Sequence, residues 1–226
     1  AQSWRRPLSE SAAASLKPGP VAVLGAMDGE IRAFLDQSAQ REEYKWQNFR
    51  FHRVEMEGRD LVIAKSGVGK TLSAMLCQRL IDLYNPSTVI FTGIAGALNP
   101  AYQLGDTVIA EDCMQYDLNA KLRGTKRGQV PFTKYRIIPS DRRLLELASD
   151  FQPENGELHR GRVLTGDSFF TESEDLSYAY MREELKGDAV EMEGASVGLV
   201  ALVNKIPFLL IRTISDLADG KFNIKI

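Results

Sequence analysis

Cysteine and histidine are scarce in this chain, and their scarcity excludes several kinds of chemistry. The two cysteines, Cys77 and Cys113, match no zinc-binding spacing and cannot form a disulfide framework. The two histidines, His52 and His159, are far apart in the sequence. A histidine-based catalytic triad or a zinc site therefore has almost no candidate residues. We expect neither a metal ion nor a cofactor.

The chain also lacks long apolar runs and a strong excess of charge. No apolar stretch reaches membrane-spanning length, so the sequence predicts no membrane span. The formal net charge is -2, which gives no reason to expect nucleic acid as a partner. With 226 residues, 44% of them hydrophobic, the chain can bury a sizeable core within one domain.

The first twenty residues differ in character from the remainder. They are polar and contain no apolar segment of the kind found in signal peptides. We therefore expect a polar N-terminal leader at 1–20 and a single domain at 21–226. We expect a cytoplasmic protein. An exported mature form is the alternative, because the sequence begins without Met.

The segment from Val190 to Asp219 carries the most chemistry. Its apolar runs at 195–203 and 207–214 predict a helix followed by a buried strand. Three carboxyl groups border these runs, those of Glu191, Glu193 and Asp216. Burial raises the pKa of a carboxyl group, so such residues are candidate proton donors near neutral pH. Glu193 and Asp216 could instead simply cap helices.

The earlier part of the chain alternates between strands and helices without a break in composition. Val21–Gly25 is typical of a central strand, and Asp28 and Glu30 follow it at the start of a helix. Asp28 suits the first turn of that helix, where a negative charge complements the helix dipole. The runs at 49–55 and 61–64 predict a hairpin.

The motif Ser66-Gly-Val-Gly-Lys70 invites comparison with a phosphate-binding P-loop. That motif requires a glycine where this chain has Ala64, so a nucleoside triphosphatase is excluded. The motif instead predicts a tight turn into a helix that stops at Asn85-Pro86. The apolar face that we expect this helix to bury comprises Leu72, Met75, Leu76, Leu80 and Leu83.

The middle of the chain continues the alternation. Residues 88–92 predict a buried strand that runs into a turn of small residues, 93–97, where a ligand could approach the backbone. Residues 117–132 predict a surface loop that could also serve as a lid or a dimer contact. A cap signal at Ser140-Asp141 begins a helix, and a strand at 163–166 precedes Phe169 and Phe170. Aromatic residues there are more often core than ligand platforms.

Together these motifs resemble the bacterial 5'-methylthioadenosine/S-adenosylhomocysteine nucleosidases, within the purine nucleoside phosphorylase-like superfamily. The matching segments occur in the family's order and extend over nearly the whole chain after residue 20. They are GAMDGEI (25–31), KSGVGK (65–70), TGIAGAL (92–98), GD (105–106), TGDSF (165–169), VEMEGA (190–195) and RTISDLAD (212–219).

The resemblance implies an α/β fold, a three-layer α/β/α sandwich around a twisted mixed central sheet, and cleavage of the N-glycosidic bond of adenine thionucleosides. It assigns Asp216 as the general acid supported by Ser215, and Glu30 as the residue that activates water. It assigns Glu193 to the ribose hydroxyls. The remaining substrate contacts that it implies are Ala95, Gly96, Phe169, Phe170, Glu191 and Met192.

The resemblance also implies a homodimer in which a loop near Pro131 completes the pocket of the partner subunit. The sequence departs from the family at Ile94, where many relatives have Ser, and at Tyr116 and Phe170. It also ends soon after Asp216, before a C-terminal helix that the resemblance implies. We therefore expect either that this helix lies outside the sequence or that the pocket is more open.

Three other functions remain open at this point. Futalosine or aminodeoxyfutalosine hydrolysis would differ mainly at the 5' side of the pocket. Phosphorolysis is less favoured, because Phe91 stands where related phosphorylases carry an Arg, and Glu30 would repel phosphate. A protein that binds nucleosides or another surface without turnover is the alternative of another class, although it would not need Glu30, Glu193 and Asp216 together.

Overall fold

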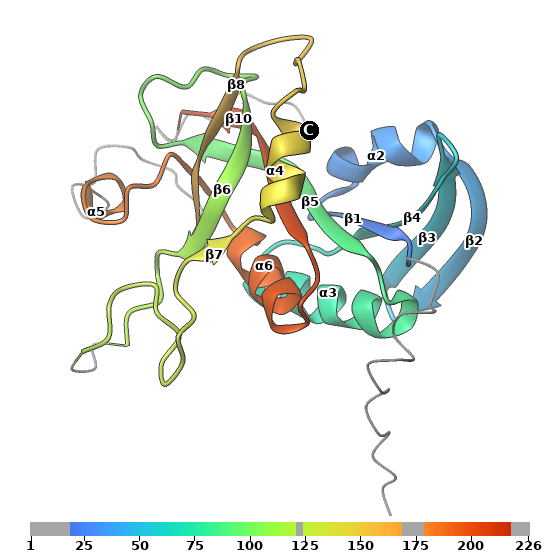
Figure 1. The fold of residues 1–226 in the computed structure, drawn as a ribbon, viewed down its shortest axis with the longest axis horizontal. Helices are drawn as coiled ribbons and strands as arrows, with labels where there is room; N and C mark the ends of the chain where they lie inside the picture. The colour runs from blue at the N-terminus through green and yellow to red at the C-terminus, as the bar shows by residue number, and fades with distance from the viewer. Residues whose placement is uncertain (1–18, 121–123, 169–178, 218–226) are drawn as a thin grey trace, which may run out of the picture.

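The computed structural model describes residues 19–120, 124–168 and 179–217. Within these ranges ten strands form one mixed sheet (Figure 1). The strands are β1 (Val21–Gly25), β2 (Ala39–Trp46), β3 (Phe49–Met56), β4 (Arg59–Lys65), β5 (Thr88–Ala97), β6 (Thr107–Gln115), β7 (Ile138–Pro139), β8 (Leu158–Thr165), β9 (Ala189–Glu191) and β10 (Phe208–Asp216). The helices are α2 (Asp28–Asp36), α3 (Lys70–Tyr84), α4 (Arg142–Ala148), α5 (Ala179–Glu183) and α6 (Gly194–Val203).

The sheet closes on itself at one end and stays open at the other. Strand β5 pairs with β9, β9 with β8, β8 with β6, β6 with β10, and β10 again with β5, which makes a ring. The first part of β5, residues 88–91, also pairs with β1, along the edge opposite β10, and β1 leads through β4 and β3 to the edge strand β2. The strand β5 therefore lies where the ring meets the open part of the sheet.

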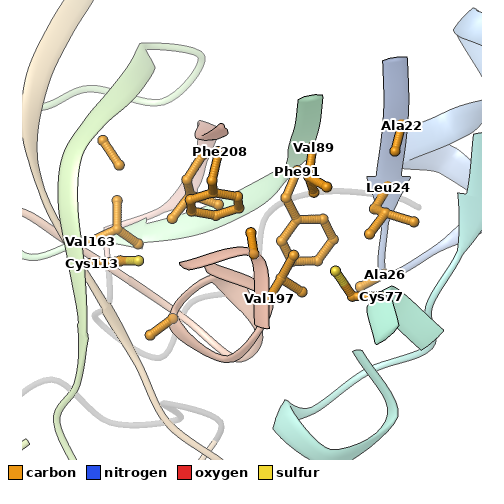
Figure 2. Close-up of a cluster of buried hydrophobic side chains, with 14 of the residues drawn as sticks. Ala22, Leu24, Ala26, Cys77, Val89, Phe91, Cys113, Val163, Val197 and Phe208 are labelled. Carbon is orange, nitrogen blue, oxygen red and sulfur yellow. The ribbon is translucent and has the colours of Figure 1, made fainter. Parts of the chain in front are cut away.

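Helices cover both faces of the sheet, which confirms the predicted three-layer α/β/α arrangement. Figure 1 shows α3 and α6 together below the sheet and α2 above β1. Helix α4 packs through Leu145 against Leu209 of β10, whereas Phe208 and Leu210 pack in the cluster that contains α6. The alternation of side chains along β1 explains the two layers. Ala22 and Leu24 pack in the cluster that contains α3 and α6, as Figure 2 shows, whereas Val23 packs against Ile31 of α2.

The prediction for the buried face of α3 was partly wrong. Leu76 and Leu80 are buried, but Leu72, Met75 and Leu83 are 40%, 41% and 37% exposed. The helix buries a stripe rotated toward Ser73, whose hydroxyl lies 2.8 Å from that of Ser196 on α6. Contact with α6 determines which face of α3 is buried. Besides Ser73, the buried residues of that face are Leu76, Cys77, Leu80 and Ile81.

The predicted turn at 93–97 is also wrong, because β5 runs without interruption to Ala97. Pairing explains the difference: Gly93 pairs with Arg212 of β10, and Gly96 pairs with both β10 and β9. The expectation of close approach holds at Gly93, where an added Cβ would lie 2.5 Å from the Oε1 atom of Glu30. Small residues are thus needed here, but inside a strand.

The hairpin of β3 and β4 and the α6–β10 unit agree with the sequence prediction. The same holds for the helix that starts after Asp141, whose carboxylate accepts from the main-chain N–H groups of Arg143 and Leu144. The strand β2 was not predicted. Residues 1–18 of the predicted leader, Phe169 and Phe170 lie outside the described residues. Among the described helices, none has the length and apolar character needed to cross a membrane.

Candidate functional site

A cavity of about 310 Å³ opens where β1, β5, β9 and β10 end. In an α/β sheet the carboxyl ends of the strands are the usual place for a ligand. The described residues that line it are Ala26, Met27, Glu30, Val68, Ile94, Ala95, Gly96, Ser168, Val190, Glu191, Met192, Glu193, Ser215 and Asp216. The cavity thus brings together all the predicted site residues that fall within the described part of the chain.

Glu30 lies in the first turn of α2 and its carboxylate is fixed by main-chain donors. Its Oε2 atom accepts hydrogen bonds from the N–H groups of Ala26 (2.6 Å) and Met27 (2.9 Å). Its Oε1 atom accepts from the N–H of Ile94 on β5 (3.0 Å). The side chain therefore connects α2 to β5 and presents an oriented carboxylate at the cavity. Asp28 instead points to Lys65, 2.8 Å away, in agreement with a first-turn role outside the cavity.

Glu193 occupies the N-cap position of α6, but its side chain makes no hydrogen bond to that helix. The Oε1 atom accepts from the N–H of Gly69, 2.7 Å away in the turn before α3. Burial and the neighbouring Glu191 raise the pKa of Glu193 to about 7, although the Gly69 N–H and Arg212 act in the opposite direction. Glu30 raises this pKa slightly further. Glu193 can therefore exchange a proton near neutral pH.

Glu191 contributes to the cavity wall, but its carboxylate is committed to groups inside the protein. It forms a buried ion pair with Arg212, with Oε2 and Nη2 2.6 Å apart. It also accepts from the N–H groups of Glu193 (3.0 Å) and Gly194 (2.7 Å) and from the Thr165 hydroxyl. These contacts fix the start of α6, and hence the main chain of Glu193.

Arg212 was not singled out in the sequence, although an Arg within the apolar run Leu-Leu-Ile-Arg-Thr-Ile was a signal. Its side chain is fully buried, and the guanidinium lies 4.4 Å from the centre of the Phe91 ring. Its Nη1 atom donates to the carbonyl of Ile211 at 3.1 Å. A buried cation of this kind needs a charged partner. Glu191 supplies that partner.

Ser215 and Asp216 end β10 beside a register shift. Ile214 pairs with Ala95 and Asp216 pairs with Gly96, so Ser215 is an extra residue in the ladder. A bulge of this kind re-aims the following side chains. The Ser215 hydroxyl lies 2.8 Å from Oδ2 of Asp216 and 3.3 Å from the carbonyl of Ala95. The serine is buried and the aspartate half-buried at the cavity wall.

The end of β10 is fastened to the loop before β6. The N–H of Gly105 donates to the carbonyl of Ile214 (2.9 Å), and the N–H of Ile214 donates to the carbonyl of Asp106 (2.8 Å). The Asp106 carboxylate is buried and lies 2.7 Å from Nε2 of His159. Burial would raise the pKa of Asp106, but the N–H groups of Gln103 and Glu157 together with His159 lower it overall. The Gly-Asp motif thus holds the strand that carries Ser215 and Asp216.

The cavity is apolar apart from a few carboxyl and hydroxyl groups. Its apolar wall includes Met27, Val68, Ile94 and Met192, of which only Met192 was predicted to contact a ligand. No lysine or arginine lines the described part of the cavity. Nor do the described residues contain a cluster of His, Cys, Asp or Glu suited to a metal ion. Such a site suits a neutral ligand with hydroxyl groups and can exchange a proton at Glu193.

The order of these elements and the position of the site match a known family. A family model described as the phosphorylase superfamily matches residues 20–224. The chain belongs to the phosphorylase superfamily. This confirms the superfamily that the motifs indicated from the sequence.

Named relatives within the phosphorylase superfamily cover most of the chain. An aminodeoxyfutalosine nucleosidase from Campylobacter jejuni is 35% identical over 89% of this chain and 87% of its own length. A 5'-methylthioadenosine/S-adenosylhomocysteine nucleosidase from Tolumonas auensis is 32% identical over 88% of this chain and 86% of its own. The predicted resemblance to these nucleosidases is therefore confirmed.

Solved structures of related proteins share the fold of this chain. The 5'-methylthioadenosine/S-adenosylhomocysteine nucleosidase from Neisseria meningitidis, in complex with methylthio-immucillin-A, superimposes with a TM-score of 0.84 at 31% identity. The superposition covers 90% of this chain and 88% of that one. A futalosine hydrolase mutant from Helicobacter pylori gives a TM-score of 0.81 at 28% identity, covering 90% and 88% of the two chains.

Proposed function

We propose that this protein hydrolyses the N-glycosidic bond of 5'-methylthioadenosine and S-adenosylhomocysteine, releasing adenine and the thioribose product. The observation that carries the proposal is the placement of Glu30, Glu193 and Asp216 around one apolar cavity that lacks a described cationic residue. The names of the relatives and of the superimposed structures support the same reaction class.

Each carboxyl group has a distinct part in the proposed reaction. Cleavage leaves negative charge on the departing base and positive charge on the sugar, so an acid is needed at one end and carboxylates at the other. Asp216, hydrogen-bonded to Ser215, gives a proton to the base. Glu193 accepts from the ribose hydroxyls, and those donors favour its ionised form in the complex. Glu30, held by three main-chain N–H groups, orients the attacking water.

The charge of the cavity favours water over phosphate as the nucleophile. A phosphate ion would have to approach Glu30 and Glu193 with no described lysine or arginine at the cavity wall to compensate. Phe91 packs against the buried Arg212, so it supplies no anion contact, and the Arg212 guanidinium is paired with Glu191. Phosphorolysis would therefore be electrostatically costly.

Aminodeoxyfutalosine is a second candidate substrate. The Campylobacter jejuni relative, which has the 35% identity given above, is named for that activity. Both substrate classes present an N-glycosidic bond to the same acid and carboxylates. The two substrate classes differ in the 5' substituent, so they differ in the group for which the opening of the cavity must leave room.

Adenine release tests the proposed function directly. We expect release from 5'-methylthioadenosine and S-adenosylhomocysteine at rates that do not depend on added phosphate. An obligatory phosphate requirement would instead identify a phosphorylase, and faster release from aminodeoxyfutalosine would select the second candidate. Binding of the nucleosides without any release would contradict the enzymatic reading and support a non-catalytic binder.

We also propose that two copies of the chain form a homodimer in which the loop near Pro131 completes the pocket of the partner. Phe132 supports this, because its side chain is 96% exposed in a turn where the Val130 N–H donates to the carbonyl of Tyr135 at 2.9 Å. Val68 at the cavity wall is also exposed, as are Leu72 and Met75 on α3. A large exposed apolar side chain gains free energy by burial in an interface.

Sedimentation velocity checks the dimer. We expect a dimer for the parent chain and weaker self-association for Phe132→Ser. The control is Phe151→Ser, which removes another exposed aromatic residue away from this loop. A parent chain that is fully active as a monomer would contradict the proposed arrangement.

A further inference from the structure

The turn at residues 66–70 resembles a phosphate-binding loop in sequence, but the structure gives it different partners. Gly69 has a φ of 95°, which a residue with a side chain rarely adopts. In this conformation its N–H points at Oε1 of Glu193, 2.7 Å away, across a sequence separation of 124 residues. The turn therefore supplies the hydrogen bond from outside the 191–194 segment that orients the Glu193 carboxylate.

Lys70, the next residue, joins this turn to two other segments. Its Nζ atom lies 2.8 Å from both carboxylate oxygens of Asp117 and 3.4 Å from Oδ2 of Asp167. The Lys70 N–H donates to Oδ1 of Asp167 at 3.2 Å, and the Asp167 N–H donates to Oδ2 of Asp117 at 3.0 Å. Three segments that follow separate strands thus meet at one ammonium group.

This network adjoins the cavity on two sides. Val68 directly precedes Gly69 in the turn, and Ser168 directly follows Asp167. Both Val68 and Ser168 line the cavity. The Lys70 side chain is only 18% exposed, so its ion pairs are less screened than those of an ordinary surface lysine. Without the lysine, the carboxylates of Asp117 and Asp167 would remain close together without a cation between them.

We propose that Lys70 is a positioning residue, whose ion pairs with Asp117 and Asp167 hold the turn so that the Gly69 N–H stays on Glu193. The effect of Lys70 on catalysis rests on the proposed function, in which Glu193 binds the ribose hydroxyls. The effect of Lys70 on the position of the Glu193 carboxylate does not depend on that function. The Lys70 side chain touches neither the ligand cavity nor Glu193, so it acts through the main chain of the turn.

The proposed role of Lys70 predicts a change in the pKa of Glu193. The groups that face this carboxyl group are Glu191, Arg212, Glu30 and the Gly69 N–H. The N–H favours the ionised form, so it lowers the pKa of Glu193 from the higher value that burial and Glu191 would otherwise produce. When the turn loosens, the other three groups stay in place. The pKa of Glu193 must then rise.

The test follows the Glu193 carboxyl group by carbon-13 NMR titration of the ligand-free protein, with the signal assigned by its loss in Glu193→Gln. We expect a higher titration midpoint in Lys70→Met than in the parent, and a midpoint near that of the parent in Lys70→Arg. The matched control is Lys65→Met, which removes a neighbouring lysine that pairs with the exposed Asp28. That control leaves the midpoint unchanged.

Activity gives a second and separate readout. We expect the kcat/KM of Lys70→Met for adenine release to fall by up to about 10²-fold at low pH, because a small misplacement of a catalytic group can cost that much. The acidic limb of its pH profile moves to higher pH, since the ionised form of Glu193 is needed. If no protein releases adenine, the proposed function fails, while the NMR titration still decides the role of Lys70.

An unchanged Glu193 midpoint in folded Lys70→Met would overturn the inference. If that variant does not fold, Asp167→Ala replaces it, because it removes the acceptor of the Lys70 N–H while Lys70 and Asp117 remain paired. We expect a smaller upward shift of the midpoint in this variant. An unchanged midpoint in folded Asp167→Ala would overturn the inference equally.

Discussion

Replacing Asp216 with Asn lowers kcat for adenine release from 5'-methylthioadenosine by about 10²- to 10⁴-fold, the usual contribution of a positioned general acid. The amide cannot give a proton to the departing base, but it keeps the shape of the side chain beside Ser215. Binding of the nucleoside is therefore retained. Initial rates at saturating substrate measure the first effect, and calorimetric titration with a non-hydrolysable thionucleoside measures the second.

Asp28→Asn is the matched control for this experiment. Asp28 is an acidic residue of the α2 first turn, two positions before Glu30, but it pairs with Lys65 away from the cavity. We expect its removal to leave kcat unchanged. The assignment of Asp216 as the acid fails if Asp216→Asn turns over as fast as the parent. An inactive variant that also loses binding would show that Asp216 holds the ligand, and would equally contradict the assignment.

Replacing Arg212 with Met has the largest effect that we expect on stability. Removing one partner of a buried ion pair leaves an uncompensated charge, which typically costs about 3–5 kcal/mol of the free energy of unfolding. Here the orphaned group is the Glu191 carboxylate, which is buried together with Arg212. The Met side chain would still pack against Phe91. Urea denaturation followed by circular dichroism measures the change.

Two further variants show whether the loss comes from the charge. Arg212→Met combined with Glu191→Gln removes the orphaned carboxylate, so we expect this double variant to regain part of the lost stability. Arg142→Met breaks an exposed ion pair with Glu146 and leaves the unfolding midpoint unchanged. An Arg212→Met protein as stable as the parent would mean that the buried pair contributes nothing to folding.

Local patterns were sufficient to predict many elements. The helix and strand at 194–216 follow from two apolar runs with Pro207 at the entrance to the second, and the structure has both elements. The Asp141 cap and the helix end at Asn85 also follow from local preferences, because side-chain caps and left-handed C-caps involve only nearby residues. The carboxyl groups of the site were recognisable because they border apolar runs, where an ionised group is costly to bury unless it is paired.

Other features depended on which elements meet. Periodicity predicted an apolar face for α3, but the contact with α6 decided that Ser73 is buried and Met75 is exposed. The small residues after Thr92 predicted a turn, but pairing with β9 and β10 keeps them in a strand. A propensity for a turn is weak compared with hydrogen bonds to strands on both sides.

By itself the sequence determined the superfamily, the alternation of strands and helices, and the acidic residues near the proposed site. The tertiary structure decided which of them act together. Glu191 at the cavity wall pairs with the buried Arg212, and Glu193 receives its hydrogen bond from Gly69 in a turn that Lys70 secures. These contacts join residues far apart in the chain, and only the packing of the strands and of the turns that follow them brings these residues within hydrogen-bond distance.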